Sequence, residues 1–296
     1  MIDLDRRTFL KAAGVGIATA TAAASLIEKP ARGEPSSDSS RPRKAFMLGV
    51  TEGPILPHFE RLREAGFDGV ELLSPNKLDR DEVLRAREKT GIVIHGVSGS
   101  RHWDSPLSDP DPAVVDRGLE AIRKSIADCA AYGGTTVLLV PAVVTKKVSY
   151  KEAFARSQEN IRKILPDAEK HGIKIAIEEV WNRFLLSAPE FARFVDSFES
   201  KSVGAYFDVG NVVEYGYPEQ WIRDLGSRIL KVHIKEYAKP KRFDYRLGEG
   251  EIDWKAVRQA FAEIGYRGWF TAEVGYGDAA SLKDVVKRMN DLLGLG

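Results

Sequence analysis

The sequence contains one cysteine, five histidines and almost no net charge. A single cysteine cannot form a disulfide within the chain, and Cys129 lies in an apolar, helix-like stretch where a small buried side chain is expected. The 44 basic and 43 acidic side chains nearly cancel, so no net field attracts nucleic acid or an acidic membrane surface. We therefore expect no nucleic-acid partner.

The sequence also lacks a hydrophobic run long enough to span a bilayer. The uncharged stretch 12–26 has about fifteen residues and is rich in Ala and Gly, whereas a membrane helix needs about twenty apolar residues. It follows Arg6, Arg7 and a Phe-Leu-Lys triplet, and this pattern resembles a twin-arginine export signal. We expect a signal at residues 1–27 that the twin-arginine machinery reads, a flexible linker at 28–43, and a protein exported to the periplasmic or cell-envelope side without a stable membrane anchor. A disordered basic N-terminus is the alternative.

Regular patterning begins after the linker. Eight short apolar or β-branched runs alternate with stretches at helical spacing, and glycines that end helices precede several of the runs. Eight strand-helix units predict a single-domain α/β fold, a (β/α)8 or TIM barrel over residues 44–296, which commonly needs about 250 residues. A doubly wound open sheet is the alternative, but no Gly-x-Gly-x-x-Gly turn follows the first run. The runs are 46–50, 69–73, 92–97, 135–140, 173–177, 203–207, 229–234 and 269–272.

Four side chains with metal-binding chemistry end runs in the second half of the chain: Glu178, Asp208, His233 and Glu273. The carboxyl ends of consecutive barrel strands meet at one mouth, so we expect these side chains to converge. Strand alternation directs Ala176 and Glu178 into the crowded interior and Glu179 outward, although a β-bulge would reverse this assignment. Three carboxylates and one imidazole favour Mn²⁺ or Mg²⁺ and admit Co²⁺ or Zn²⁺. Taken singly, each acid also fits a salt bridge or a helix cap, and the histidine fits a core position.

Five segments, in this order, resemble the xylose isomerase-like barrel family of sugar and sugar-phosphate isomerases and epimerases: IEEVWNRFLLS, FDVGN, KVHIKEY, GEGEIDW and GYRGWFTAEV. The resemblance covers nearly everything from Lys44 to the C-terminus. It implies a divalent ion held by Glu178, Asp208, His233 and Glu273. One position departs from the family, because epimerase members commonly carry a histidine where this chain has Asn211, and an amide cannot shuttle protons. Ketose 3-epimerase activity is therefore the less favoured form of the expected chemistry.

The expected chemistry is proton transfer next to a carbonyl. Moving a carbonyl, or inverting a carbon beside one, requires removal of a weakly acidic C–H proton, and a metal stabilises the enediolate that forms. Glu178 and Glu273 would lie on opposite sides of the substrate and act as general base and acid as well as ligands. Asp208 and His233 would mainly hold the ion. The predicted function is thus a metal-dependent sugar isomerase or epimerase.

Further residues are candidates for the substrate pocket, each with a structural alternative. Glu71, read as the end of the second strand, would orient a ligand or bind hydroxyls, and Glu236 would accept a hydrogen bond from His233 or from the substrate. The remaining candidates are placed in loops near the barrel mouth, where a ring of tryptophan can stack on a sugar face and a basic side chain can clamp a phosphate. These are His95, His102, Trp103, Asn182, Asn211 and Arg246.

Compartment and substrate constrain each other. Exported enzymes rarely meet sugar phosphates, so an unphosphorylated sugar, keto-sugar or glycoside derivative is favoured. Two alternatives stay open, a metal-dependent lyase or dehydratase on keto-sugars or glycosides and a sugar-binding barrel without catalysis. A phosphodiester-cleaving nuclease with a multi-metal cluster is disfavoured, because five histidines supply too few ligands. The sequence leaves a homo-oligomer open.

Overall fold

The protein was analysed as a computed structural model that describes residues 41–295. The predicted export signal and residues 28–40 of the predicted linker lie outside the described residues. No helix within residues 41–295 is long and apolar enough to cross a membrane.

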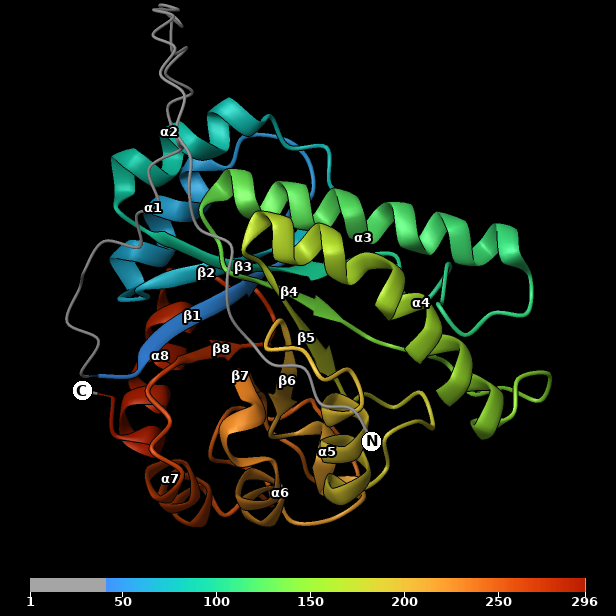
Figure 1. Cartoon of the computed structure of the whole chain (residues 1–296). Helices are drawn as coiled ribbons and strands as arrows, with labels where there is room; N and C mark the ends of the chain where they lie inside the picture. The colour runs from blue at the N-terminus through green and yellow to red at the C-terminus, as the bar shows by residue number, and fades with distance from the viewer. Residues whose placement is uncertain (1–40, 296) are drawn as a thin grey trace, which may run out of the picture. The chain divides into compact units, whose positions relative to one another are not determined.

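Eight parallel strands form a closed barrel in which each strand pairs with the next and β8 pairs with β1 (Figure 1). This confirms the predicted (β/α)8 fold. Each predicted run overlaps one strand, and no strand end differs from its prediction by more than three residues. The strands are β1 Arg43–Leu48, β2 Gly69–Ser74, β3 Val93–Gly99, β4 Thr136–Leu139, β5 Lys174–Glu178, β6 Val203–Asp208, β7 Ile229–Ile234 and β8 Trp269–Ala272.

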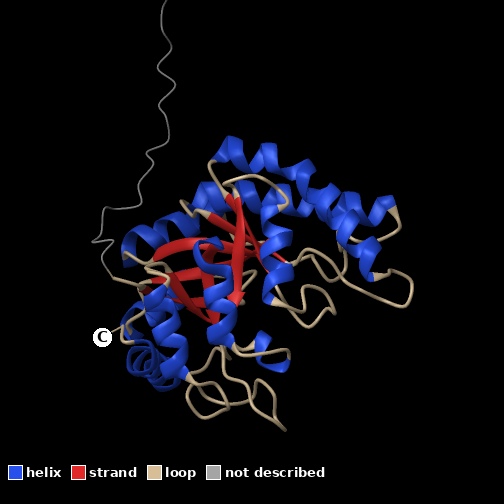
Figure 2. Cartoon of the chain, turned by 60° about the horizontal axis from the view of Figure 1, so that its bottom comes forward, coloured by secondary structure: helices blue, strands red, loops and turns tan. Residues whose placement is uncertain are grey.

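A helix follows every strand, and the helices surround the barrel (Figure 2). Local chemistry sets their ends: α4 begins at a capping box between Ser149 and Glu152 and ends at Gly172, whose φ of 67° suits glycine. The helices are α1 Leu56–Ala65, α2 Arg80–Thr90, α3 Pro112–Tyr132, α4 Tyr150–His171, α5 Ala188–Asp196, α6 Pro218–Leu225, α7 Trp254–Glu263 and α8 Ala279–Leu293. Two short 3₁₀ helices, η1 Asn211–Glu214 and η2 Gly226–Arg228, lie between β6 and β7.

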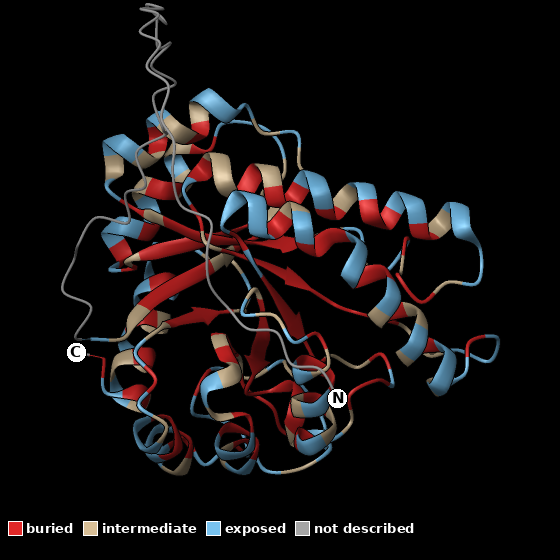
Figure 3. Ribbon diagram, viewed as in Figure 1, coloured by how far each residue is buried: buried red, intermediate tan, exposed pale blue. Residues whose placement is uncertain are grey.

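Strand alternation divides the core into two parts. Ile175 and Ile177 of β5 face outward and join the large apolar layer between the strands and the helices. Ala176 points inward and packs with Leu138, Val140 and Tyr206 inside the barrel. Most strand residues are buried, whereas the helices expose their outer faces (Figure 3). Because Glu178 shares its face with Ala176, the predicted inward direction of its side chain is confirmed.

Candidate metal centre

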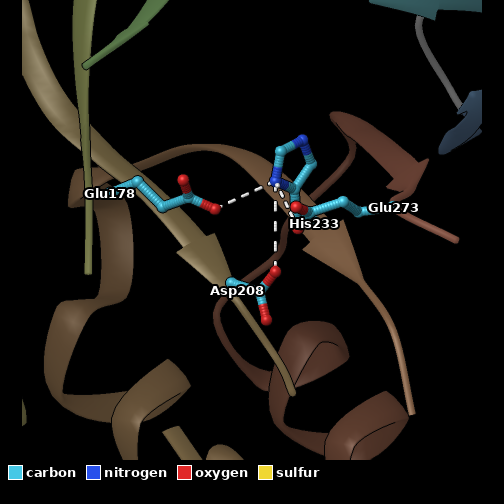
Figure 4. Close-up of side chains that lie close together, drawn as sticks. All are labelled: Glu178, Asp208, His233 and Glu273. Carbon is cyan, nitrogen blue, oxygen red and sulfur yellow. Dashed lines mark hydrogen bonds and ion pairs between the residues drawn. The ribbon is translucent and has the colours of Figure 1, made fainter. Parts of the chain in front are cut away.

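The four predicted ligand side chains converge at the carboxyl ends of four neighbouring strands (Figure 4). Glu178 is the last residue of β5 and Asp208 the last of β6, whereas His233 lies one residue before the end of β7 and Glu273 directly follows β8. Strand register places Asp208 beside His233. One ligand atom from each of the four residues lies within 4.8 Å of the others. The tertiary structure thus unites all four.

The imidazole of His233 lies at the centre of this group. Its Nδ1 is 3.0 Å from Glu178 Oε1, 3.3 Å from Glu273 Oε2 and 4.0 Å from Asp208 Oδ2. Three of the side chains are buried, whereas that of Glu273 is 32 % exposed. The group is therefore open to solvent on the side of Glu273.

The chemistry of these donors fits a divalent cation. Three carboxyl groups meet one imidazole and one ammonium, that of Lys235, so the group carries a surplus of negative charge once its carboxyl groups are deprotonated. Asp208 Oδ2 is fully buried and accepts no hydrogen bond within the described residues, although the Lys235 ammonium faces it at 3.2 Å. Oxygen-rich ligation with one nitrogen suits Mn²⁺ or Mg²⁺ and admits Co²⁺ or Zn²⁺.

Burial and neighbouring charges shift the pKa values of the group in different directions. Burial raises the pKa of Glu178, and it raises the pKa of Asp208 to about 7. Burial acts the same way on Glu273, but Lys235 and His233 outweigh it and hold the pKa of Glu273 below its ordinary value. Burial would lower the pKa of His233, yet the surrounding carboxylates hold it well above its ordinary value. Metal binding must therefore displace protons, so metal affinity should weaken as the pH falls.

The sequence analysis missed Lys235 as a member of this group. Lys235 directly follows β7, and its Nζ lies 2.8 Å from Glu273 Oε2 and 3.2 Å from Asp208 Oδ2. Strand alternation could have predicted this position, because residues two apart along a strand share a face and Lys235 lies two residues after His233. It was overlooked because it stands beyond the end of the apolar run.

Glu71 lies beneath the group rather than at a strand end. It is the third residue of β2, fully buried inside the barrel, which corrects the expectation that it ends the strand. Its Oε2 lies 3.5 Å from His233 Nε2 and accepts a hydrogen bond from the Tyr206 hydroxyl. Since Nδ1 of the same ring faces the three carboxylates, Glu71 is placed to fix the orientation of His233. It has no access to a substrate hydroxyl.

We predict that Glu71→Gln lowers the affinity for a divalent ion by about ten- to hundredfold, because the imidazole loses the carboxylate that orients it. Isothermal titration of metal into metal-stripped protein measures this directly. Glu82→Gln is the matched control, since Glu82 accepts a hydrogen bond from Ile55 N away from the group. Equal metal affinity in Glu71→Gln and wild type would refute the orienting role.

His95 belongs to the barrel interior and does not follow the third strand. It is the third residue of β3, and its ring stacks on Trp269 with centroids 4.7 Å apart. Its Nε2 is 3.1 Å from the hydroxyl of Thr271. Burial lowers the pKa of His95 well below its ordinary value. The core-packing alternative thus describes His95, and a substrate contact does not.

Asn182 and Asn211, which were predicted to line the substrate pocket, instead hydrogen-bond to the backbone of neighbouring loops. Asn182 donates to Ala142 O at 2.6 Å and accepts from Phe184 N at 3.0 Å. Asn211 donates its side-chain amide to Glu179 O at 2.9 Å, and its backbone N–H donates to Asp208 Oδ1 at 2.7 Å. Both amides are buried. They position the chain around the metal centre instead of presenting free groups to a substrate.

Glu236 and Arg246 also fall outside the group. Glu236 is fully buried, and its carboxylate accepts from Gly248 N at 2.6 Å and from Trp254 Nε1 at 2.8 Å. It anchors the loop between β7 and α7 and contacts neither His233 nor the barrel mouth, because strand alternation turns it away from Lys235. Arg246 is exposed in the same loop, and within the described residues it makes no ion pair with the clustered carboxylates.

His102 and Trp103 lie in the loop after β3, as predicted. Their rings meet edge to face with centroids 5.2 Å apart, and the Trp103 side chain is 56 % exposed. The exposed Trp103 ring is accessible for stacking on a ligand.

The protonation of His102 should make the unfolding free energy depend on pH. Burial lowers the pKa of His102 from its ordinary 6.5 to about 4. The folded state thus favours the neutral imidazole, and the contribution of this group to the unfolding free energy is fully present above pH 6.5. It is lost as the pH falls from 6.5 to about 4, because in this range the imidazole takes up a proton in the unfolded state but not in the folded state. We expect His102→Gln to gain about 1–2 kcal/mol of unfolding free energy relative to wild type between pH 7 and pH 5. Urea unfolding at the two pH values measures this difference, and a pH-independent difference would contradict it.

Comparison with known proteins agrees with the geometry. The chain is 26 % identical over 270 residues to L-ribulose-5-phosphate 3-epimerase UlaE of Escherichia coli O1:K1 / APEC, covering 82 % of this chain and 95 % of that protein. It is 27 % identical over 272 residues to the uncharacterized protein MJ1311 of Methanocaldococcus jannaschii, covering 83 % and 90 %.

Solved structures share the barrel. The structure of L-ribulose 3-epimerase superposes with a TM-score of 0.74 at 20 % identity, covering 86 % of this chain and 95 % of that chain. The structure of 3-keto-D-glucoside 4-epimerase YcjR from E. coli gives a TM-score of 0.71 at 20 % identity, covering 85 % and 99 %. The family model described as xylose isomerase-like TIM barrel matches residues 59–292. The chain therefore belongs to the xylose isomerase-like TIM barrel family.

Proposed function

We propose that the protein is a divalent-metal-dependent sugar isomerase or epimerase that transfers a proton at a carbon next to a carbonyl group. The observation that carries this proposal is the convergence of three carboxylates and one imidazole within 4.8 Å at the barrel mouth. Relatives that are sugar epimerases support a small carbohydrate as substrate. When bound, the ion would supply positive charge that stabilises the substrate oxygens as the proton leaves the neighbouring carbon.

The two glutamates are assigned the proton transfers. Glu178 comes from β5 and Glu273 follows β8, and β6 and β7 lie between these strands in the barrel. Their carboxylates therefore reach the centre from different directions, which is what a base and an acid on two sides of one carbon require. Asp208 and His233 hold the ion, and Glu71 orients His233.

The proposed substrate is an unphosphorylated sugar, keto-sugar or glycoside derivative. This choice rests on the proposed export, since the periplasmic side offers few sugar phosphates. The side-chain amide of Asn211 is bound to Glu179 O and cannot carry a proton, so the proposal does not require a residue at this position to act in catalysis.

Proton exchange with solvent tests the proposal. The full chain is stripped of metal, reloaded separately with Mn²⁺, Mg²⁺, Co²⁺ or Zn²⁺, and incubated in deuterated water with a panel of free and phosphorylated aldoses, ketoses and keto-glycosides. We expect metal-dependent deuterium incorporation next to the carbonyl, detected by NMR, together with an isomerised or epimerised product. Chelation of the metal should abolish both.

The same experiment separates the alternatives. Loss of water or of a glycosidic group from the panel compound would identify a lyase or dehydratase. Tight sugar binding without exchange under any metal would identify a binding barrel and overturn the proposed catalysis.

Export is proposed through the twin-arginine route. Arg6→Lys combined with Arg7→Lys should retain at least about nine-tenths of the precursor in the cytoplasm, because a receptor reads the arginine pair. Immunoblots of periplasmic and cytoplasmic fractions measure this, with Lys11→Arg as the charge-preserving control in the same segment. Unchanged export of the double variant would point to another route.

A further inference from the structure

The ammonium of Lys235 uses the same oxygen atoms that a metal ion needs. Its Nζ is 2.8 Å from Glu273 Oε2 and 3.2 Å from Asp208 Oδ2. These two oxygens are also the atoms of their residues that lie nearest His233 Nδ1. An ammonium and a divalent ion repel each other, so they would compete for these two oxygens. Lys235 is therefore expected to weaken metal binding, whereas a residue that only supports the metal ligands would strengthen it.

The surroundings of Lys235 hold its side chain in this place. The side chain is 12 % exposed, and Nζ lies 4.8 Å from the centre of the Phe243 ring. Its stem passes over Gly210, where a Cβ atom would lie only 2.7 Å from Lys235 Cγ. Gly210 has a φ of −80°, which any residue can adopt. Glycine is therefore required at this position because the Lys235 side chain leaves no room for a Cβ atom, and not because of the backbone conformation.

Lys235 lies on the open side of the group. Side-chain alternation places it one step beyond His233 toward the mouth, and its partner Glu273 is the most exposed of the four clustered side chains. A substrate that entered on the side of Glu273 would meet this ammonium as it reached the carboxylates.

We infer that Lys235 is a further catalytic residue, whose ammonium gives up Asp208 and Glu273 to the divalent ion and contacts the negatively charged oxygen that the sugar develops during proton transfer. The inference deepens the proposed function and rests on it. Two cations, the metal ion and the Lys235 ammonium, would then stabilise the negative charge on the reacting oxygen. A positioned donor of this kind typically contributes about a hundredfold or more to turnover.

Binding measurements test the inference without a known sugar substrate. The full chain is titrated with Co²⁺ in competition with a chelating dye, and the Co²⁺-loaded protein is then titrated with acetohydroxamate, a planar bidentate oxyanion that mimics an enediolate. Lys235→Met should bind Co²⁺ about tenfold or more tightly, because the competing charge is gone, and acetohydroxamate about tenfold or more weakly, because its partner is gone. These opposite shifts distinguish a contact with the oxyanion from a structural role.

Two further variants sharpen the result. Gly210→Ala should push the Lys235 stem away and reproduce both shifts in part without removing a charge. Lys239→Met removes one exposed charge from the same loop and should change neither affinity. Circular dichroism confirms that each variant is folded.

Three outcomes would overturn the inference: a loss of both affinities in Lys235→Met, tighter Co²⁺ binding with unchanged acetohydroxamate binding, or no change in either. The first outcome would show that Lys235 supports the structure of the site. The second would show that Lys235 only neutralises part of the negative charge of the carboxylates. Failure of the proposed function has a different signature, namely wild-type protein that binds no divalent ion or exchanges no sugar proton in the panel.

Discussion

Asp208→Asn is expected to lower the affinity for a divalent ion by about a hundredfold and to abolish metal-dependent proton exchange. The carboxylate is fully buried, and apart from the ion pair with Lys235 Nζ at 3.2 Å its Oδ2 accepts no hydrogen bond within the described residues. Substitution removes one of three negative ligands from the group. An amide oxygen remains, but a neutral oxygen binds a hard cation much more weakly than a charged one.

The barrel should stay folded in this variant. Asp208 Oδ1 accepts from Asn211 N at 2.7 Å, and the asparagine amide oxygen can accept the same hydrogen bond. Removing a buried carboxylate whose pKa is raised to about 7 also relieves part of the cost of burying its charge. Thermal unfolding of the metal-free proteins should therefore change little.

Metal content after dialysis, measured by plasma mass spectrometry, checks the expected loss. Asp196→Asn serves as the control, because Asp196 is half-exposed and pairs with Arg228 away from the centre. A normal metal content in Asp208→Asn would remove Asp208 from the ligand set.

Measured at saturating metal, Glu178→Gln and Glu273→Gln are each expected to reduce turnover by about a hundredfold or more. Metal affinity should also fall in both variants, as in Asp208→Asn, because a neutral oxygen replaces a charged ligand. Glutamine keeps an oxygen that can face the ion but cannot take up a proton. The proton transfer that is lost belongs to the transition state, so kcat at saturating metal should fall more than the affinity for the substrate changes. Single-turnover kinetics with the substrate found in the exchange panel, alongside metal titration, separate the two effects.

The two variants need not behave alike. In an epimerase each glutamate serves one face of the carbon, so one variant can still exchange the substrate proton from its own side. An isomerase with one base would lose exchange in only one variant. Near-normal turnover in both would make the two glutamates structural ligands and move the proton carrier elsewhere. His102 would remain a candidate, whereas Glu236 is committed to its loop.

Residues at strand ends could be assigned from the sequence because their direction follows from local rules. Alternation along KIAIEEV distinguishes Glu178 from Glu179, and no bulge falls within the register between β5 and β6. A parallel barrel gathers the carboxyl ends of its strands at one mouth, so four strand-end residues are enough to predict a shared centre.

Residues inside strands and in loops escaped this argument. Glu71 was read as the end of its strand and His95 as following its strand, but each is the third residue of its strand, because β2 ends at Ser74 and β3 at Gly99. That difference moves both side chains from the mouth into the interior. Lys235 stands just beyond an apolar run and was not among the predicted site residues, although its side chain contacts Asp208 and Glu273.

The sequence by itself determined the eight-stranded barrel, the inward face of β5 and the four side chains of the candidate metal centre, because apolar periodicity and alternation are properties of neighbouring residues. The tertiary structure alone decided which side chains surround those four. Glu71 meets His233 across the barrel, and Lys235 meets Glu273 from an adjacent strand end. Such contacts depend on barrel closure, strand register and the space over Gly210, which residues far apart in the chain create together.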